Sequence, residues 1–222
     1  LDYAMNNCPP WIRIPRVVRD IPHQYISGGL KCGNMRQHIE NDFGFQGKDI
    51  RFREIGRHPE YDIKDAKLFV RCYPASNGIE YFISMESENK KALFGFCRLR
   101  IPSSNYDEEI AFPDTIKNKG LIRELHVYGS LVSVIHNELN PNSMQHSGIG
   151  KKLIKKAENI AFYKHFKMGT VVISGIGVRN YYKKLNYKLE NNYMVKSFYN
   201  NIIQCLLVIL FAVTVLYYNY ML

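Results

Sequence analysis

Cysteine is scarce in this chain, and its spacing argues against one large class of small proteins. The 222 residues include five cysteines, and no two of them form a C-x-x-C pair. They are Cys8, Cys32, Cys72, Cys97 and Cys205. No N-terminal secretory signal is visible either. A disulfide-stapled secreted domain therefore finds no support. Free thiols in a reducing compartment are the simplest account, and we predict no metal ligands.

Acidic residues are also few relative to basic ones. There are 20 aspartates and glutamates against 30 lysines and arginines, which gives a formal net charge of +10. The arginines of residues 13–57 interleave with aromatic residues, so phosphate contacts and stacking surfaces lie together. They are Arg13, Arg16, Arg19, Arg36, Arg51, Arg53 and Arg57, with Trp11, Tyr25 and Phe52. Charge alone leaves two alternatives open, a surface for a polyanion and a basic surface that only aids solubility.

Charge is absent from the end of the sequence. No charged residue occurs from Ile202 to Leu222, and ~20 apolar residues are enough to cross a bilayer core. Lys196 would mark the near interface, and Tyr217, Tyr218 and Tyr220 the far one. We expect residues 199–222 to be a tail-anchor transmembrane segment, with the remainder in the cytoplasm. The mitochondrial outer membrane is favoured over the endoplasmic reticulum. The alternative is a buried helix or a pair of strands.

A polar loop with two glycines precedes a helical run. Gly148 and Gly150 follow Gln145, and the next residues place Leu153, Ile154, Ala157, Ile160 and Ala161 on one helix face. The first turn of a helix offers free N–H groups and a partial positive charge, so a diphosphate fits there if no Cβ atom blocks it. Glycine also serves ordinary turns, and the motif alone leaves both interpretations open.

The remaining pattern predicts an α+β fold with a mixed sheet. Apolar and aromatic runs with partial alternation predict strands at 67–73, 79–85, 93–99, 120–127 and 170–174. A helix is expected from 151 to about 165. Residues 1–48 have the proline and glycine content of a connector, with one short helix around 34–41.

Several segments, in order along the chain, resemble known enzymes. They are residues 9–13, 19–22, 33–36, 49–56, 123–129, 145–150, 173–182 and 193–196. The strand and glycine loop resemble the acetyl-CoA-binding core of the GNAT acetyltransferase superfamily. More narrowly, the chain resembles the C-terminal part of the catalytic subunits of Elongator, which are radical-SAM and acetyltransferase-like enzymes that modify wobble uridine in tRNA.

This resemblance implies a domain organisation. Residues 1–58 would be a connector from a radical-SAM region, 59–198 a GNAT-type acetyl-CoA-binding domain with a splayed, mostly antiparallel sheet, and 199–222 the tail anchor. Because the sequence begins at Leu1 and not at Met, we expect a radical-SAM domain upstream. That domain would hold S-adenosylmethionine and a [4Fe-4S] cluster. The family carries a zinc-binding cysteine just before Asp49, where this chain has Gly47 and Lys48, which puts a zinc site there in question.

The resemblance also assigns residues to acetyl-CoA. The backbone of a strand would pair with the pantetheine amides, a loop would hold the pyrophosphate, and a tyrosine would lie near the thioester sulfur. The binding residues are Glu124, Leu125, His126, Val127, Gln145, Gly148, Ile149, Gly150, Lys151, Lys152, Tyr181 and Tyr182. Glu124 and Tyr182 are the catalytic candidates. Adjacent tyrosines cannot share a helix face, so one of the pair could simply pack. For His126 and His146 a structural role is favoured over a general base.

Three functional hypotheses follow. The first is part of a tRNA carboxymethyluridine synthase, an acyltransferase that uses acetyl-CoA, with tRNA and other Elongator subunits as partners. The second is a protein lysine acetyltransferase acting on histones or tubulin. The third is a non-catalytic, membrane-tethered tRNA-binding module.

Overall fold

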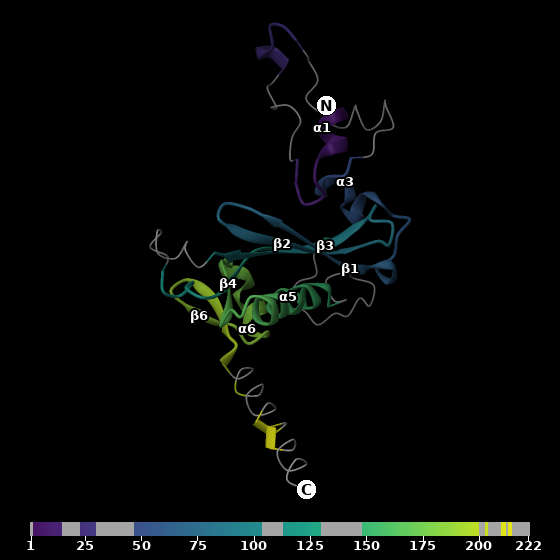
Figure 1. Ribbon diagram of the computed structural model, residues 1–222. Coiled ribbons are helices and arrows are strands. Elements are labelled where there is room, and N and C mark those ends of the chain that lie inside the picture. Colours follow the sequence, from purple (N-terminus) through teal and green to yellow (C-terminus); the bar gives the residue numbers. More distant parts are fainter. Residues whose placement is uncertain are drawn as a thin grey trace.

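The computed structural model describes residues 2–14, 23–29, 47–103, 113–129 and 148–199, together with residues 203, 210, 211, 213 and 214. Within this part of the chain, one seven-stranded sheet has the order β1-β2-β3-β4-β5-β7-β6 (Figure 1). The strands are β1 (Lys67–Pro74), β2 (Gly78–Glu86), β3 (Leu93–Pro102), β4 (Gly120–Val127), β5 (Gly169–Val172), β6 (Lys188–Glu190) and β7 (Tyr193–Ser197). Only β4 and β5 pair in parallel. The predicted mixed, mostly antiparallel sheet is confirmed.

Helices lie on both sides of this sheet. Figure 1 shows α5 and α6 on one side, and α1 and α3 on the other. The α-helices are α1 (Asp2–Asn7), α3 (Ile50–Arg53), α5 (Ile149–Asn159) and α6 (Arg179–Lys183). Shorter turns are η1 (His23–Tyr25), η2 (Ile55–Arg57), η3 (Ile63–Asp65), the π-helical η5 (Ile160–Lys164) and η6 (Ile176–Val178). The helix expected around 34–41 lies outside the described residues.

The face of the sheet that carries α5 is apolar. The helix buries Leu153, Ile154 and Ala157 and turns Lys151 and Lys152 to solvent, as its periodicity predicts. Large side chains of the central strands meet it, and each fully buried one contributes about 1.5–3 kcal/mol. They include Tyr81, Ile83, Phe94, Leu99 and Ile122. Hydrophobic burial therefore fixes α5 on the sheet and with it the loop that begins the helix.

The opposite face of the sheet contains buried charges beside a small aromatic cluster. Glu86 has no exposed surface and receives hydrogen bonds from Arg71 at 2.6 and 2.9 Å, while Arg53 lies 3.2 Å away. Arg53 also donates to the backbone oxygens of Pro10, Lys48 and Lys90. One buried arginine thus ties the segment before β1 to the turn between β2 and β3. The same face packs Phe82 and Phe96 against Ile50 of α3.

The uncharged C-terminal run is described at only a few positions. Among the described residues, no helix is long and apolar enough to cross a membrane. Most of residues 199–222 fall outside the described part of the chain. The tail anchor therefore stays a prediction.

Candidate functional site

The strands β4 and β5 separate after a short stretch of pairing. They are in register from Gly120 with Thr170 to Ile122 with Val172. β5 ends there, two residues before the predicted end of that strand, whereas β4 continues to Val127. Arg123 is an extra residue in the pairing of β4 with β3, and such a bulge bends its strand. The bend explains why Ile173 and Ser174 do not extend the sheet as predicted.

This separation leaves an edge that can bind a ligand. Beyond Ile122, β4 pairs with β3 on one side and, within the described residues, with no strand on the other. Alternate backbone N–H and C=O groups of residues 123–127 therefore face the opening, where an extended chain containing amides can pair with them. Leu125 and Val127 pack against the core under α5.

The helix α5 begins at the mouth of the same opening. Gly148 is its N-cap in the left-handed region, with φ of +73°, and no atom of the described residues lies within 4 Å of where its Cβ would be. Its oxygen accepts from the Lys152 N–H at 3.0 Å. Ile149 is buried, so the helix start is anchored while its first N–H groups point outward. Gln145 and His146 lie outside the described residues.

The two adjacent tyrosines of α6 have different surroundings. A Cβ on Gly150 would lie 2.6 Å from the Tyr181 hydroxyl oxygen and 3.6 Å from Val127. Position 150 therefore requires glycine, because any larger side chain would collide with the Tyr181 hydroxyl. Burial raises the pKa of Tyr181 to about 12. Tyr182 is buried in the core, with its ring 5.7 Å from that of Tyr187, and burial raises its pKa further. The structure thus brings the Tyr181 hydroxyl, and not that of Tyr182, to the glycine loop.

The polar side chains of β4 lie on the opposite face of the sheet. Glu124 accepts a hydrogen bond from Arg98 at 2.9 Å. The ring of His126 lies between those of Phe96 and Tyr128, with centroids 6.0 and 4.5 Å away. Burial, followed by the charge of Arg13, lowers the pKa of His126. Glu124 and His126 are thus separated by the sheet from the side chains beneath α5.

One polar group at the start of α6 has no assigned role in the sequence prediction. The Nε of Arg179 is buried and has no hydrogen-bond partner among the described atoms. Arg179 begins α6, two residues before Tyr181. A buried donor without a partner is unusual, so Arg179 is a further candidate for contact with an anionic ligand. The sequence indicates Arg179 as a site residue only through its place in the 173–182 segment that resembles known enzymes.

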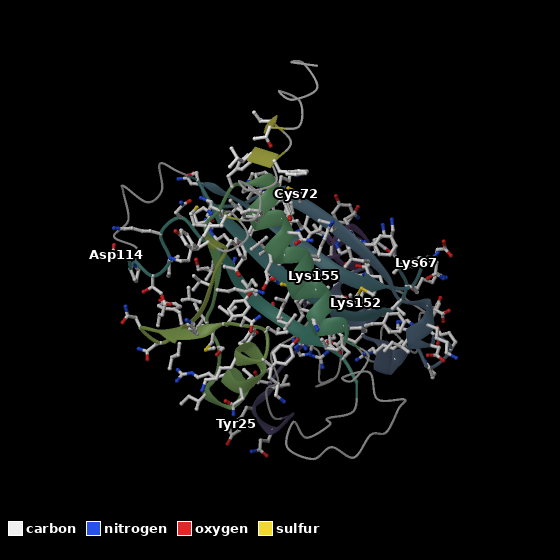
Figure 2. The ribbon with its side chains drawn as sticks, turned by 90° about the horizontal axis from the view of Figure 1, so that it is seen from below. Tyr25, Lys67, Cys72, Asp114, Lys152 and Lys155 are labelled. Carbon is white, nitrogen blue, oxygen red and sulfur yellow. The ribbon has the colours of Figure 1, made fainter. Side chains whose placement is uncertain are left out.

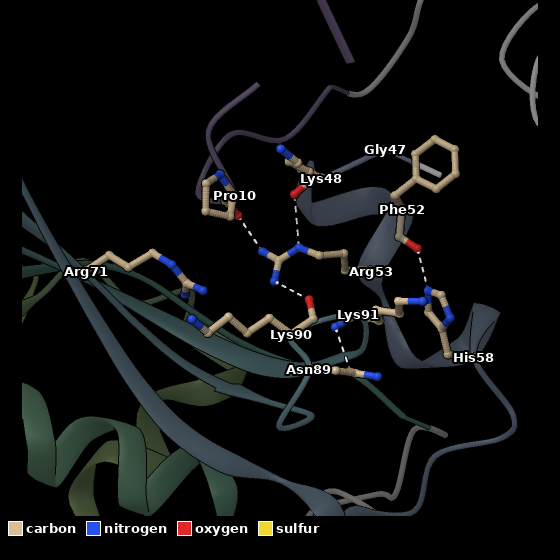
Figure 3. Close-up of a pocket in the computed structure, with 10 residues that line it drawn as sticks. All are labelled: Pro10, Gly47, Lys48, Phe52, Arg53, His58, Arg71, Asn89, Lys90 and Lys91. Atoms are coloured by element: carbon tan, nitrogen blue, oxygen red, sulfur yellow. Dashed lines mark hydrogen bonds between the residues drawn. The ribbon is translucent and has the colours of Figure 1, made fainter. Parts of the chain in front are cut away.

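A basic pocket lies on the sheet face away from α5 (Figure 3). Its cavity of about 390 Å³ is bounded by the segment before β1, the turn between β2 and β3, and β1 itself. The lining residues are Pro10, Gly47, Lys48, Phe52, Arg53, His58, Arg71, Asn89, Lys90 and Lys91. None of them is acidic. Arg53 and Arg71 share Glu86, which leaves three lysines to give the pocket its positive charge. No group of residues suited to a metal ion occurs in the described part of the chain.

The splayed sheet and the glycine-capped helix define an acetyltransferase-type α+β domain. No protein-family profile matches the chain. It is 42% identical over 195 residues to Elongator complex protein 3 of Schizosaccharomyces pombe and 40% identical over 194 residues to that of Homo sapiens. These alignments cover 85% of this chain but only 35% and 34% of the relatives, so the chain spans about a third of their length.

Among solved structures, Elp3 of the archaeon Methanocaldococcus infernus, with an N-terminal deletion, is similar. It aligns with a TM-score of 0.72 at 35% identity, over 88% of this chain and 46% of that one. The chain belongs to the Elongator complex protein 3 family and fits the C-terminal part of its members. The resemblance seen in the sequence is confirmed.

Proposed function

We propose that this chain is the acetyl-CoA-binding part of an Elongator-type tRNA wobble-uridine carboxymethyl synthase. The observation that carries the proposal is the separation of β4 from β5 beside the start of α5. Family membership supports a tRNA-modifying acyltransferase. S-adenosylmethionine and the [4Fe-4S] cluster would belong to an upstream domain, and acetyl-CoA supplies the acetyl group when bound.

The residues of this chain have distinct tasks in that proposal. The free edge of residues 123–127 pairs with the pantetheine amides. The first N–H groups of α5 hold the pyrophosphate, and exposed Lys151 and Lys152 add positive charge. The Tyr181 hydroxyl, held over Gly150, is placed to donate a hydrogen bond to the cofactor. Its raised pKa keeps the phenol protonated at neutral pH.

The basic pocket supports contact with RNA. Lys48, Lys90 and Lys91 line the cavity, and clustered lysines suit contacts with the phosphates of RNA. The pocket opens on the face of the sheet opposite α5. RNA and acetyl-CoA would therefore approach the sheet from different sides.

The geometry of Glu124 bears on the lysine acetyltransferase alternative. A base that deprotonates a lysine amine must have a carboxylate oxygen directed at the acceptor. Glu124 Oε2 instead accepts a hydrogen bond from Arg98, whose guanidinium also donates to the Trp11 backbone oxygen at 2.7 Å. This pairing favours the tRNA synthase over an amine acetyltransferase.

An acetyl-CoA hydrolysis assay tests the proposed function. We expect slow hydrolysis by the chain that increases when tRNA is added and does not respond to a histone or tubulin peptide. Stimulation by the peptide alone would favour the lysine acetyltransferase. No hydrolysis and no acetyl-CoA binding by folded protein would favour the non-catalytic tRNA-binding module.

We also propose that residues 199–222 anchor the domain in a membrane, with the mitochondrial outer membrane favoured. Support comes from the uncharged run after Asn201 and from the tail residues that are described. Leu210, Phe211 and Val213 are helical, and their side chains are 61, 70 and 56% exposed. The chain should resist alkaline carbonate extraction from membranes, whereas a chain ending at residue 198 should be extracted. Extraction of both would contradict the anchor.

A further inference from the structure

Four apolar side chains are exposed together where the last strand ends. Tyr163 is 65% exposed, Phe166 81%, Met168 41% and Tyr199 63%. We call these four residues the aromatic end face. They surround buried Phe198, whose ring packs 5.6 Å from that of Phe162 and whose N–H donates to the Met168 oxygen at 2.9 Å. The end of α5–η5 and the end of β7 therefore form one continuous surface.

Phe166 is the most unusual member of this surface. Its φ is +51°, in the left-handed region that bulky residues rarely adopt. The backbone is held there because the Phe166 N–H donates to the Phe162 oxygen and the Lys167 N–H to the Ala161 oxygen. The result is an aromatic ring that projects from the domain into solvent. Such a side chain indicates a surface that contacts something apolar.

The length of the connection to the uncharged run places this surface near a bilayer. Phe198 is fixed in the core, and the uncharged run begins at Ile202. The intervening residues, even if fully extended, span at most ~14 Å. The headgroup layer on one side of a bilayer is itself ~5–7 Å thick. Even with these residues fully extended, a chain that inserts from Ile202 onward holds the aromatic end face within ~9 Å of the headgroup layer.

The charges around the aromatic end face suit that position. Lys164 and Lys167 flank Phe166 in sequence, and His165 is hydrogen-bonded to the Tyr81 hydroxyl at 2.7 Å. The nearby carboxylate, Glu158, is neutralised by Lys196 at 2.9 Å. Aromatic rings bordered by lysines are typical of residues at a membrane interface, where phosphate groups lie above the acyl chains.

We infer that the aromatic end face rests on the phospholipid headgroups, so that the domain is oriented on the membrane and not merely tethered to it. The inference rests on the tail anchor proposed above. It also predicts which way the candidate site faces relative to the membrane. Gly148 caps α5 and Lys164 ends η5, so a helix of ~24 Å separates the glycine loop from the aromatic end face. In Figure 2, Lys155 lies closer than Lys152 to the yellow C-terminal segment at the top of the view. The acetyl-CoA opening would face the cytosol.

Quenching by brominated phospholipids tests this orientation. The full chain carries Phe166→Trp or, as a control, Ile176→Trp, and is reconstituted into vesicles of phosphatidylcholine and phosphatidylinositol. Ile176 is also 81% exposed but lies in η6, beyond the end of β5 that is opposite to Met168. Trp11 is the only native tryptophan and gives both variants the same background. With bromines near the headgroups, the indole introduced by Phe166→Trp should lose about half its emission, and the one introduced by Ile176→Trp should not respond, because interfacial side chains penetrate ~5–10 Å.

The controls separate failure of this inference from failure of the anchor. Vesicle flotation reports the anchor independently, and acetyl-CoA binding reports the site. A protein that floats while neither introduced indole is quenched would overturn the inference but leave the anchor intact. Blue-shifted emission from the Phe166→Trp variant that bromine does not quench would mean that a second protein surface covers this face, which also overturns it. A protein that does not float would overturn both. Tyr163→Ser with Phe166→Ser should still float but lose the fixed orientation, seen as faster protease cleavage between residues 199 and 201.

Discussion

The two faces of the central sheet are built from different chemistry. Under α5, the sheet is held by apolar side chains such as Phe94 and Leu99, which are fully buried. On the other face, buried Glu80 and Glu86 are paired with arginines. The first face needs only hydrophobic burial, which is non-directional. The second depends on charge pairs with fixed geometry, and it positions the segment before β1 together with the basic pocket.

This difference explains where the excess positive charge is displayed. Glu80 accepts from Arg100 and Arg123, and Glu86 from Arg71 with Arg53 alongside. The charges of the two buried carboxylates are therefore neutralised by these arginines within the sheet face. The lysines around the pocket keep their charge for an external anion. One face thus supports the proposed acetyl-CoA site by packing, and the other supports the proposed RNA contact by electrostatics.

Among the variants considered, removal of the buried Glu86 carboxylate should cause the largest loss of stability. Glu86→Gln leaves Arg53 and Arg71 in contact with a neutral amide, and loss of one partner of a buried pair lowers the free energy of unfolding by about 3–5 kcal/mol. Chemical denaturation measures this change. Glu88→Gln is the matched control, because Glu88 is exposed and its ion-pair partner within the described residues is exposed Lys67. Equal stability of the two variants would contradict the account of this face.

The same carboxylate predicts a pH dependence. Burial alone would raise the pKa of Glu86, but the hydrogen bond from Arg71 and the charge of Arg53 outweigh it and hold the pKa below its usual value. The stabilisation is therefore present above about pH 4.5 and is lost as the pH falls through the lowered pKa. Wild-type protein should lose stability in that acid range, and Glu86→Gln should lose less.

A negative charge at the start of α5 should weaken acetyl-CoA binding without changing the packing under the helix. Gly148→Asp and Gly148→Asn add side chains of equal size, and both residues tolerate the left-handed backbone. We expect the aspartate to weaken acetyl-CoA binding by about 100-fold, or ~2.7 kcal/mol, through repulsion of the phosphates. The asparagine should cost only a few-fold. Calorimetry measures both affinities, and identical affinities would mean that the phosphates bind elsewhere.

The two tyrosines of α6 offer a smaller test on the α5 face. Tyr181→Phe should weaken acetyl-CoA binding or hydrolysis by about 5-fold, because one hydrogen bond to the cofactor is worth ~1 kcal/mol. Tyr182→Phe should change affinity little, since its hydroxyl lies in the core. The opposite ranking would restore Tyr182 as the residue nearest the thioester.

The histidine of β4 should give the smallest effect. Burial lowers the pKa of His126, so protonation favours the unfolded chain, and stability falls as the pH drops below about 6.5. His126→Phe should keep the ring contact with Tyr128 and make stability less dependent on pH between about 7 and 5. The stability of the variant at pH 8 isolates any change in packing. An unchanged pH slope would mean that His126 does not titrate in this range.

The apolar face could be predicted from the sequence because its pattern is local. The α5 stripe and the strand runs have the spacing that burial requires, and they occur where predicted. The charged face could not. Arg53, Arg71 and Glu86 are distant in sequence, and charged residues within a strand are ordinarily taken as exposed.

The site was predictable only in part for a related reason. The glycine loop and β4 can be recognised as a motif, but the early end of β5 depends on the bulge at Arg123. Which tyrosine meets the loop depends on the rotation of a five-residue helix. Both are set by tertiary packing, which a single sequence does not express.

Calorimetric titration of the full chain in mild detergent with acetyl-CoA, with and without tRNA, tests the central claim most directly. We predict saturable binding with one site per chain that becomes tighter when tRNA is present. Absence of heat and of competition by coenzyme A, in protein shown to be folded, would contradict the assignment of the splayed edge and the α5 start as an acetyl-CoA site.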